Sequence, residues 1–330
     1  MRRCRRRCVA QLAAGDSGPA RGAPQGRQQT PANAMLRVVH APTLSRMSVS
    51  RGVATLRRTR SQVQQWNAFK TVLQAAAKDT QPAPLLGLWA SAGSPQVTEL
   101  VSLVPGLSWL VIDMEHAPNT LPSVLAQLQA AQASGTEAVV RVPCATDPVI
   151  VKQVLDLGVR SIMFPAVESA AEAAAAVAST RYPPRGCRGV MTTARMSGYA
   201  VEAGALREYY ERSEREMCVV VQVESLAAVE AIPEMAAVDG VDAIFLGPSD
   251  LAASMGHLGN PAHPDVGAAM ARAFALCSDA GIASGSISAD EGMCRSMVEQ
   301  GATFVAVGTD LSVLGTGLRR VLEGVAGKEN

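Results

Sequence analysis

The chain has 330 residues, of which 48% are hydrophobic and only 18% are charged, so it can bury a large core as one big domain or two smaller ones. No apolar run approaches the roughly 20 residues needed to cross a bilayer, so we expect a soluble protein with no membrane partner. The seven cysteines are scattered without a CxxC pair, which disfavours structural zinc and favours free thiols in a reducing compartment.

The net charge of +1 hides a strongly basic start. Residues 1–60 contain 13 arginines and one acidic residue, Asp16, while the remainder contains 17 basic and 28 acidic residues. We predict that residues 1–62 form a disordered basic leader with the composition of a transit peptide, which would place the protein in mitochondria or another organelle. Two alternatives stay open. Translation could begin at an internal Met (Met35 or Met47), giving a cytoplasmic protein, or the leader could bind nucleic acid.

The nucleic-acid alternative is the weakest of the three because the leader lacks lysine and interleaved aromatic residues. We therefore expect no nucleic-acid partner. Residues 63–330 are predicted to form a single folded domain.

Within this domain, apolar runs alternate with amphipathic or Ala-rich stretches. The predicted strands are 84–90, 109–114, 137–143, 161–167, 218–224, 241–247, 282–288 and 303–308. The predicted helices are 98–104, 121–132, 149–158, 169–180, 226–238, 268–281, 291–301 and 313–324.

Strands that are apolar throughout indicate a parallel sheet covered on both faces. Eight strand–helix units predict an α/β fold, the (β/α)8 TIM barrel. A doubly wound open sheet is the alternative, but no strand is followed by GxGxxG or a Walker lysine. The segment 181–216 is unusually long for a connection in such a barrel and predicts a lid, a subunit contact or a plain surface excursion.

Four strands end in polar residues that a core does not tolerate unless they point into a site. These residues are His116, Arg141, Glu224 and Asp250. The carboxyl ends of barrel strands form the active-site mouth in TIM-barrel enzymes. The pattern therefore predicts a metal-assisted enzyme.

Glu224 and Asp250 are the candidate metal ligands, since Mg²⁺ binds through one or two carboxylates plus water and substrate oxygens. Mg²⁺ is the first expectation, and Mn²⁺ or Co²⁺ are alternatives. Position alone is equally compatible with two ordinary acids at a solvent-facing barrel mouth.

His116 is the natural general base at neutral pH, although a histidine after a strand is often only a loop residue. Asp156, on the helix after Arg141, could orient His116, although an acid on a helix surface is the default. Arg141 could grip a carboxylate or stabilise an oxyanion, or pair structurally with an acid. None of the four lysines lies at a strand end, so a Schiff-base mechanism has no candidate nucleophile.

Residues 86–322 resemble the HpcH/HpaI family of class II pyruvate aldolases. The resemblance lies in SWLVIDMEHAPN, VVRVP, DPVIVKQVLDLG, AVASTRYPPRGCRGV, VVVQVES, the segment from VDGVDAIFLGPSD to NPAHPDV, and GATFVAVGTD. Within the family, the sequence is most similar to the branch that cleaves 5-keto-4-deoxy-glucarate (2-dehydro-3-deoxyglucarate).

This resemblance implies a barrel of the phosphoenolpyruvate/pyruvate-domain type and assigns roles to seven residues. Three are catalytic: His116 accepts a proton, Asp156 raises the basicity of His116, and Arg141 stabilises an enolate-like transition state. Gln222 and Ser249 bind substrate, and Glu224 and Asp250 bind the divalent metal. The implied reaction is retro-aldol cleavage of a 2-keto-4-hydroxy acid to pyruvate and an aldehyde. The implied assembly is a homohexamer, a dimer of trimers, with the last helix exchanged between subunits.

Three departures from the family pattern stand out. Met114 replaces the usual glycine before Glu-His, PCATDP contains one extra residue, and the segments MTTARMSGYA and GSIS differ. The last departure bears on the pocket for the aldehyde half of the substrate. Two other functions are therefore kept. One is an oxaloacetate decarboxylase or macrophomate-synthase-like enzyme with the same metal-enolate site, and the other is a non-catalytic barrel subunit.

Overall fold

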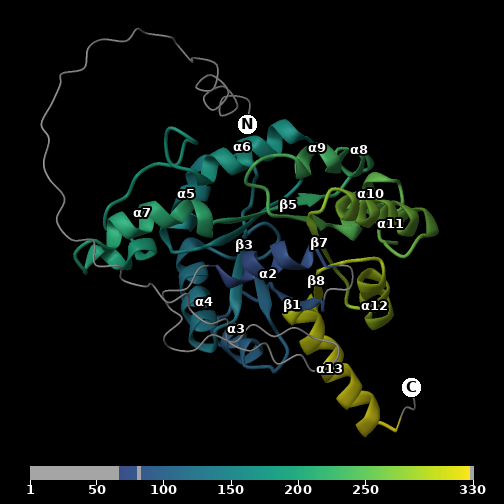
Figure 1. Cartoon of the computed structure of the whole chain (residues 1–330). Coiled ribbons are helices and arrows are strands. Elements are labelled where there is room, and N and C mark those ends of the chain that lie inside the picture. The colour runs from purple at the N-terminus through teal and green to yellow at the C-terminus, as the bar shows by residue number, and fades with distance from the viewer. Residues whose placement is uncertain (1–66, 80–82, 328–330) are drawn as a thin grey trace, which may run out of the picture. The chain divides into compact units, whose positions relative to one another are not determined.

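The computed structural model describes residues 67–79 and 83–327. Eight parallel strands close into a barrel in chain order, with the last strand paired to the first (Figure 1). The strands are β1 (Leu85–Ala90), β2 (Trp109–Asp113), β3 (Glu137–Arg141), β4 (Ser161–Phe164), β5 (Cys218–Val223), β6 (Ala243–Leu246), β7 (Ala283–Ile287) and β8 (Phe304–Thr309). The predicted TIM barrel is confirmed. The predicted leader, residues 1–62, lies outside the described residues.

Among the described residues, one helix precedes the first strand, the others follow strands on the outside of the barrel, and the last one runs outward from the end of β8. They are α2 (Ala68–Ala76), α3 (Pro95–Ser102), α4 (Leu121–Ser134), α5 (Pro148–Asp156), α6 (Ala170–Thr180), α7 (Ala205–Glu216), α8 (Leu226–Glu230), α9 (Ile232–Ala236), α10 (Pro248–Ser254), α11 (Pro264–Asp279), α12 (Glu291–Glu299) and α13 (Asp310–Val325). The single helix predicted over 226–238 is divided into α8 and α9 at Ala231. Pro233 explains the break, since it lacks the N–H that a continuous helix would need there.

Aromatic rings pack together with aliphatic side chains inside the barrel. Trp109 packs edge-on against Phe304, with ring centroids 5.4 Å apart, and donates its indole N–H to the Leu85 carbonyl at 3.0 Å. Gly87 makes room for this ring, because a Cβ at that position would lie 2.2 Å from Trp109 Cε2. The two residues fit as a pair, so the one strand glycine in β1 is a packing requirement.

Helix α2 closes the end of the barrel where the strands begin. The side-chain amide of Asn67, just before α2, donates to Ser161 Oγ at 2.8 Å and to the Arg160 carbonyl at 3.0 Å. Lys70 pairs with Asp242 at 2.9 Å. Lys70 is therefore used in this closure, far from the ends of the strands that carry the candidate site.

The long connection 181–216 contains a short 3₁₀ helix, η2 (Arg195–Ala200), and α7. Arg195 of η2 donates to the Leu157 carbonyl at 2.7 Å and to Gln132 Oε1 at 2.6 Å. Both acceptors lie at the ends of helices that run antiparallel to the strands, so they mark the end of the barrel where the strands begin. The connection does not form a lid over the opposite mouth. In the described part of the chain, no helix has the length and apolar character needed to span a membrane.

Candidate active site

The end of β2 is joined to the end of β3 by a buried ion pair. Asp113 accepts from Arg141 Nε at 2.8 Å and from Nη2 at 2.7 Å, so both carboxylate oxygens are engaged. Backbone N–H groups of Glu115 and His116 also donate to Asp113, at 2.9 and 3.4 Å. Burial raises the pKa of Asp113, but the hydrogen bonds and charge of Arg141 outweigh it, and the pKa lies below its usual value. Asp113 is therefore a fixed negative charge.

The Arg141 guanidinium also contacts an acidic, an amide and an aromatic side chain. Its Nη1 lies 2.9 Å from Glu115 Oε2 and 3.5 Å from Gln222 Oε1, and its centre stands 5.0 Å from the Trp89 ring. Only 5% of the residue is exposed. A guanidinium fixed in this way is preorganised to meet negative charge that develops on a substrate oxygen.

The turn after β2 carries His116. Asn119 anchors this turn by donating to the Asp113 carbonyl at 2.7 Å, and its own side-chain oxygen accepts from Gln127 at 2.7 Å. His116 has 67% of its side chain exposed, and its Nε2 lies 3.9 Å from Glu115 Oε2. The turn thus presents an imidazole at the open mouth, where it can take a proton from a bound molecule.

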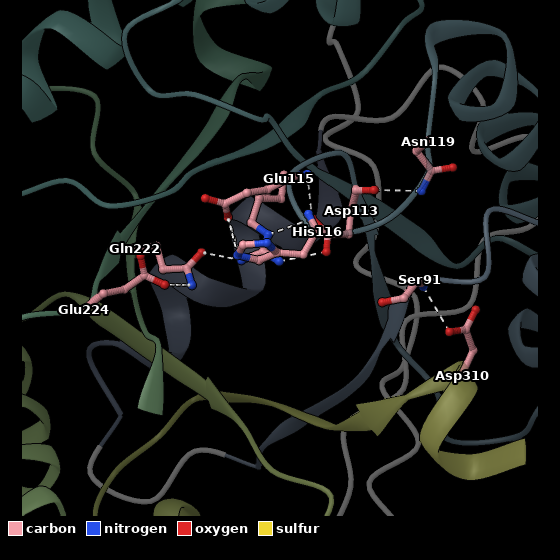
Figure 2. Close-up of polar contacts among 9 residues, drawn as sticks. Ser91, Asp113, Glu115, His116, Asn119, Gln222, Glu224 and Asp310 are labelled. Atoms are coloured by element: carbon pink, nitrogen blue, oxygen red, sulfur yellow. Dashed lines mark hydrogen bonds and ion pairs between the residues drawn. The ribbon is translucent and has the colours of Figure 1, made fainter. Parts of the chain in front are cut away.

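Glu224 directly follows β5 and is held by its neighbours. Its Oε2 accepts from the Ala166 N–H at 3.1 Å, and its Oε1 accepts from Gln222 Nε2. Figure 2 shows Gln222 and Glu224 together on one side of the turn that carries Asp113 and His116. Ala166 has a positive φ of 48°, a conformation that non-glycine residues rarely adopt and that recurs at functional sites.

Gly247, at the end of β6, leaves the space that Glu224 occupies. A Cβ at Gly247 would lie 2.5 Å from Glu224 Oε1 and 2.8 Å from its Cγ. Asp250 and Ser249 come next in the chain, exposed in the first turn of α10. The β6–α10 junction therefore shapes the Glu224 position and supplies the second predicted carboxylate.

The carboxylates at the mouth fit a divalent cation. Burial and the nearby charges of Asp250 and Glu115 raise the pKa of Glu224 to about 7, and burial, opposed by the charge of Arg141, raises the pKa of Glu115. Carboxylates that repel one another in this way are stabilised by a bound cation, and an all-oxygen donor set suits Mg²⁺ or Mn²⁺. Glu224 and Asp250 would hold the ion, and substrate oxygens and water would complete its shell.

Asp156 does not lie at the barrel mouth with the other predicted site residues. It is the last residue of α5, at the end of the barrel where the strands begin, and it accepts from Arg188 Nη2 at 3.1 Å. Arg188 is itself stacked on Tyr182, with 4.6 Å from the guanidinium carbon to the ring centroid. Within one chain, the structure thus brings six of the seven predicted site residues to the same mouth and places Asp156 apart from His116.

Asp113, Glu115 and Trp89 are site residues that the strand-end pattern did not single out. Asp113 is 1% exposed and ends an otherwise apolar strand, which is the same signal that pointed to Arg141. Glu115 stands beside His116 in the sequence, and nothing in its local pattern distinguishes it from a solvent-exposed loop acid. The position of Trp89 under Arg141 follows only from closure of the barrel.

The barrel, with carboxylate, arginine and histidine groups at its mouth, defines the class of protein, a TIM-barrel enzyme. The family model described as HpcH/HpaI aldolase/citrate lyase matches residues 85–315. The chain belongs to this family. Both activities in that name break carbon–carbon bonds, so the predicted enzyme class, a carbon–carbon lyase, is confirmed.

Individual relatives agree with this assignment. The 5-keto-4-deoxy-D-glucarate aldolase of Salmonella arizonae is 43% identical over 257 residues, which are 78% of this chain and 96% of the relative. The structure of an HpcH/HpaI aldolase/citrate lyase family protein from Burkholderia cenocepacia is 41% identical, with a TM-score of 0.73, and covers 79% of this chain and 99% of that chain. An HpcH/HpaI aldolase from Desulfitobacterium hafniense is 28% identical, with a TM-score of 0.66, over 73% of this chain and 92% of its own.

Proposed function

We propose that this enzyme is a divalent-metal-dependent class II aldolase that cleaves 2-keto-4-hydroxy acids of the 2-keto-3-deoxy sugar-acid type to pyruvate and an aldehyde. One observation carries the proposal: the fixed Arg141 guanidinium lies in the same mouth as the carboxylates of Glu224 and Asp250. The name of the Salmonella relative supports 5-keto-4-deoxy-D-glucarate as the first substrate to test.

The proposed reaction needs one base and one stabilised oxyanion. His116 takes the proton from the 4-hydroxyl of the substrate, and the C3–C4 bond breaks to release the aldehyde. The bonding electrons move onto the 2-keto oxygen, where Arg141 stabilises the resulting enolate. Protonation at C3 then gives pyruvate. A divalent cation bound by Glu224 and Asp250 would supply Lewis-acid polarisation of the keto oxygen.

Gln222 and Ser249 are proposed to orient the substrate. Gln222 is 3% exposed and lies between Arg141 and Glu224, with hydrogen bonds to both. Ser249 precedes Asp250 in the first turn of α10, where hydroxyl and backbone N–H groups can meet a carboxylate. The role of Asp156 in raising the basicity of His116 would require that Asp156 reach the site of another copy of the chain.

Release of pyruvate, measured by coupling to lactate dehydrogenase, tests the proposal. Metal-stripped protein is supplied with 5-keto-4-deoxy-D-glucarate or with oxaloacetate, with and without Mg²⁺, and Mn²⁺ and Co²⁺ are compared at the same concentration. Mg²⁺-dependent pyruvate from the sugar acid supports the aldolase. If only oxaloacetate is turned over, the enzyme is a decarboxylase rather than an aldolase. If neither substrate gives metal-dependent pyruvate, the result favours a non-catalytic barrel.

We also propose a homohexameric assembly in which α13 packs on a neighbouring copy. Apolar side chains recur at helical spacing along this helix, and Leu314 and Val325 are 68% and 84% exposed. Figure 1 shows α13 running outward from the end of β8. An apolar stripe of this kind is typical of an interaction surface. Leu314→Glu with Leu318→Glu should reduce the mass measured by light scattering, while Thr316→Glu, on the opposite side of α13, should leave the mass unchanged.

For residues 1–62 we propose a transit peptide. The Salmonella relative is matched over 96% of its length by 78% of this chain, which agrees with an added segment in this protein. A fusion of residues 1–62 to a fluorescent protein should enter an organelle, and replacement of its arginines by glutamine should leave the fusion in the cytoplasm.

A further inference from the structure

Two histidines and one aspartate gather at the junction between α10 and α11, outside the set of residues proposed for the aldolase site. His257 lies in the turn after α10, His263 caps α11, and Asp265 lies in the first turn of α11. Atoms of these three side chains that could bind an ion all lie within 4.8 Å of one another.

The backbone of the junction fixes the two histidines close together. His257 N–H donates to the Ala252 carbonyl at 2.8 Å, and two further turns follow, from Asn260 N–H to the His257 carbonyl at 2.9 Å and from His263 N–H to the Asn260 carbonyl at 3.1 Å. As a result the two imidazole rings stack with centroids 3.6 Å apart and planes 14° apart.

Both imidazoles face the same carboxylate. His257 Nε2 lies 3.4 Å and His263 Nδ1 lies 3.7 Å from Asp265 Oδ2. Ligand atoms around a tetrahedral Zn²⁺ lie about 3.4 Å apart. The Nδ1 of His263 also accepts the Asp265 N–H at 3.2 Å and so caps α11.

We propose that His257, His263 and Asp265 form a second divalent-cation site, for a Zn²⁺-class transition ion. Two imidazole nitrogens and one carboxylate are a borderline donor set that suits such ions better than Mg²⁺. On binding, the two rings would turn out of their stack, and the Nδ1 of His263 would exchange its hydrogen bond with the Asp265 N–H for the ion. Their side chains are 26% and 31% exposed, which leaves room for this rotation.

The ion would tie the end of α10 to the start of α11. Because the first turn of α10 carries Ser249 and Asp250, a bound ion would stiffen the segment that supplies one side of the barrel mouth. The positive end of the α11 dipole opposes a cation, so the Asp265 carboxylate is essential to the site.

The test uses the full chain, stripped of metal, and titrates Zn²⁺ against a chromophoric chelator. The double variant His257→Gln/His263→Asn removes both imidazoles, and asparagine preserves the cap of α11. We expect the wild type to bind one Zn²⁺ more per chain than this variant. Glu224→Gln/Asp250→Asn is the matched control: it removes the barrel-mouth carboxylates and should keep the additional Zn²⁺.

Equal Zn²⁺ stoichiometry and affinity in the wild type and the histidine variant would overturn the proposal. Asp265→Asn, which keeps both rings, gives a second readout if the double variant folds poorly. Co²⁺ bound to the wild type should show visible absorption of a nitrogen-ligated, low-coordinate ion, and Asp265→Asn should lose it. Visible absorption that is unchanged in Asp265→Asn would also count against the site. Neither measurement depends on aldolase activity.

Discussion

Asp113 and Arg141 are register partners on the adjacent parallel strands β2 and β3, and the carboxylate of one grips the guanidinium of the other through two hydrogen bonds of 2.8 and 2.7 Å. Residues in register on neighbouring parallel strands project to the same side of the sheet. The barrel alignment itself therefore delivers Arg141 to the mouth with its orientation already fixed.

Loss of Asp113 should leave the buried guanidinium of Arg141 without its carboxylate partner. Breaking a buried ion pair by removing one partner costs roughly 3–5 kcal/mol. We expect Asp113→Asn to lower the free energy of unfolding in denaturant titrations and to reduce pyruvate release, while the exposed Asp279→Asn changes neither. A variant as stable and active as the wild type would show that the pair has no such role.

The same pair predicts a pH dependence of stability. The pKa of Asp113 is lower in the folded protein than its usual value of about 3.9. Its contribution to stability is therefore fully present above that usual value and is lost as the pH falls through the lower, folded-state pKa. Below about pH 4, the free energy of unfolding should fall more steeply in the wild type than in Asp113→Asn. Parallel slopes would contradict this expectation.

Arg141→Lys should fail to replace the arginine. Lysine keeps the charge but cannot form the two-pronged contact with Asp113 or stack over Trp89 in the same way. Removal of an oxyanion donor lowers turnover roughly 10²–10³-fold. Sugar-acid cleavage and oxaloacetate decarboxylation should fall together, because both pass through the same enolate, and a selective loss of one reaction would argue against this role.

His116→Ala should separate the two reactions. Aldol cleavage needs removal of a hydroxyl proton, whereas decarboxylation has no such proton to remove. We expect kcat for cleavage to fall roughly 10²–10⁴-fold, with a much smaller loss in decarboxylation measured on the same preparation. If both reactions lose activity equally, a group other than His116 removes the hydroxyl proton.

Gly247→Ala should disturb Glu224 without unfolding the barrel. The added Cβ would lie 2.5 Å from Glu224 Oε1, so the carboxylate must move. The Mg²⁺ concentration for half-maximal activity should rise, with little change in the circular dichroism spectrum. Gly267→Ala is the matched control, because a Cβ there meets nothing within 4 Å. An unchanged Mg²⁺ requirement in Gly247→Ala would mean that Glu224 is not held in this position for the ion.

The barrel and most of the mouth could be predicted from sequence because their signals are local. Each strand is a short apolar run, and Arg141 or Glu224 is conspicuous as a charge at the end of one. Which side chains contact these residues depends on the register between strands and on closure of the barrel. Asp113 meets Arg141 across a strand pair, and Trp89 reaches the guanidinium from β1, which no local pattern encodes.

The sequence left three alternatives for residues 181–216 (a lid, a subunit contact or a plain surface excursion) and could not choose among them for a related reason. The length and composition of residues 181–216 indicate an excursion, but the side of the barrel on which it packs depends on contacts such as Arg195 with the Leu157 carbonyl. Asp156 shows the same limit. Its sequence position fits the family motif, while its place at the end of α5, beside Arg188, follows from the direction of that helix.

Asp310, the first residue of α13, accepts a hydrogen bond from the backbone N–H of Ser91 at 2.9 Å, across more than 200 positions of the chain (Figure 2). It also accepts from the Ala92 N–H at 3.0 Å. β8 likewise completes the sheet by pairing with β1. During synthesis, the edge of β1 that pairs with β8 therefore has no partner strand until β8 has left the ribosome. Such an edge is prone to wrong pairings, so the chain order of this barrel leaves β1 open to them until β8 is synthesised.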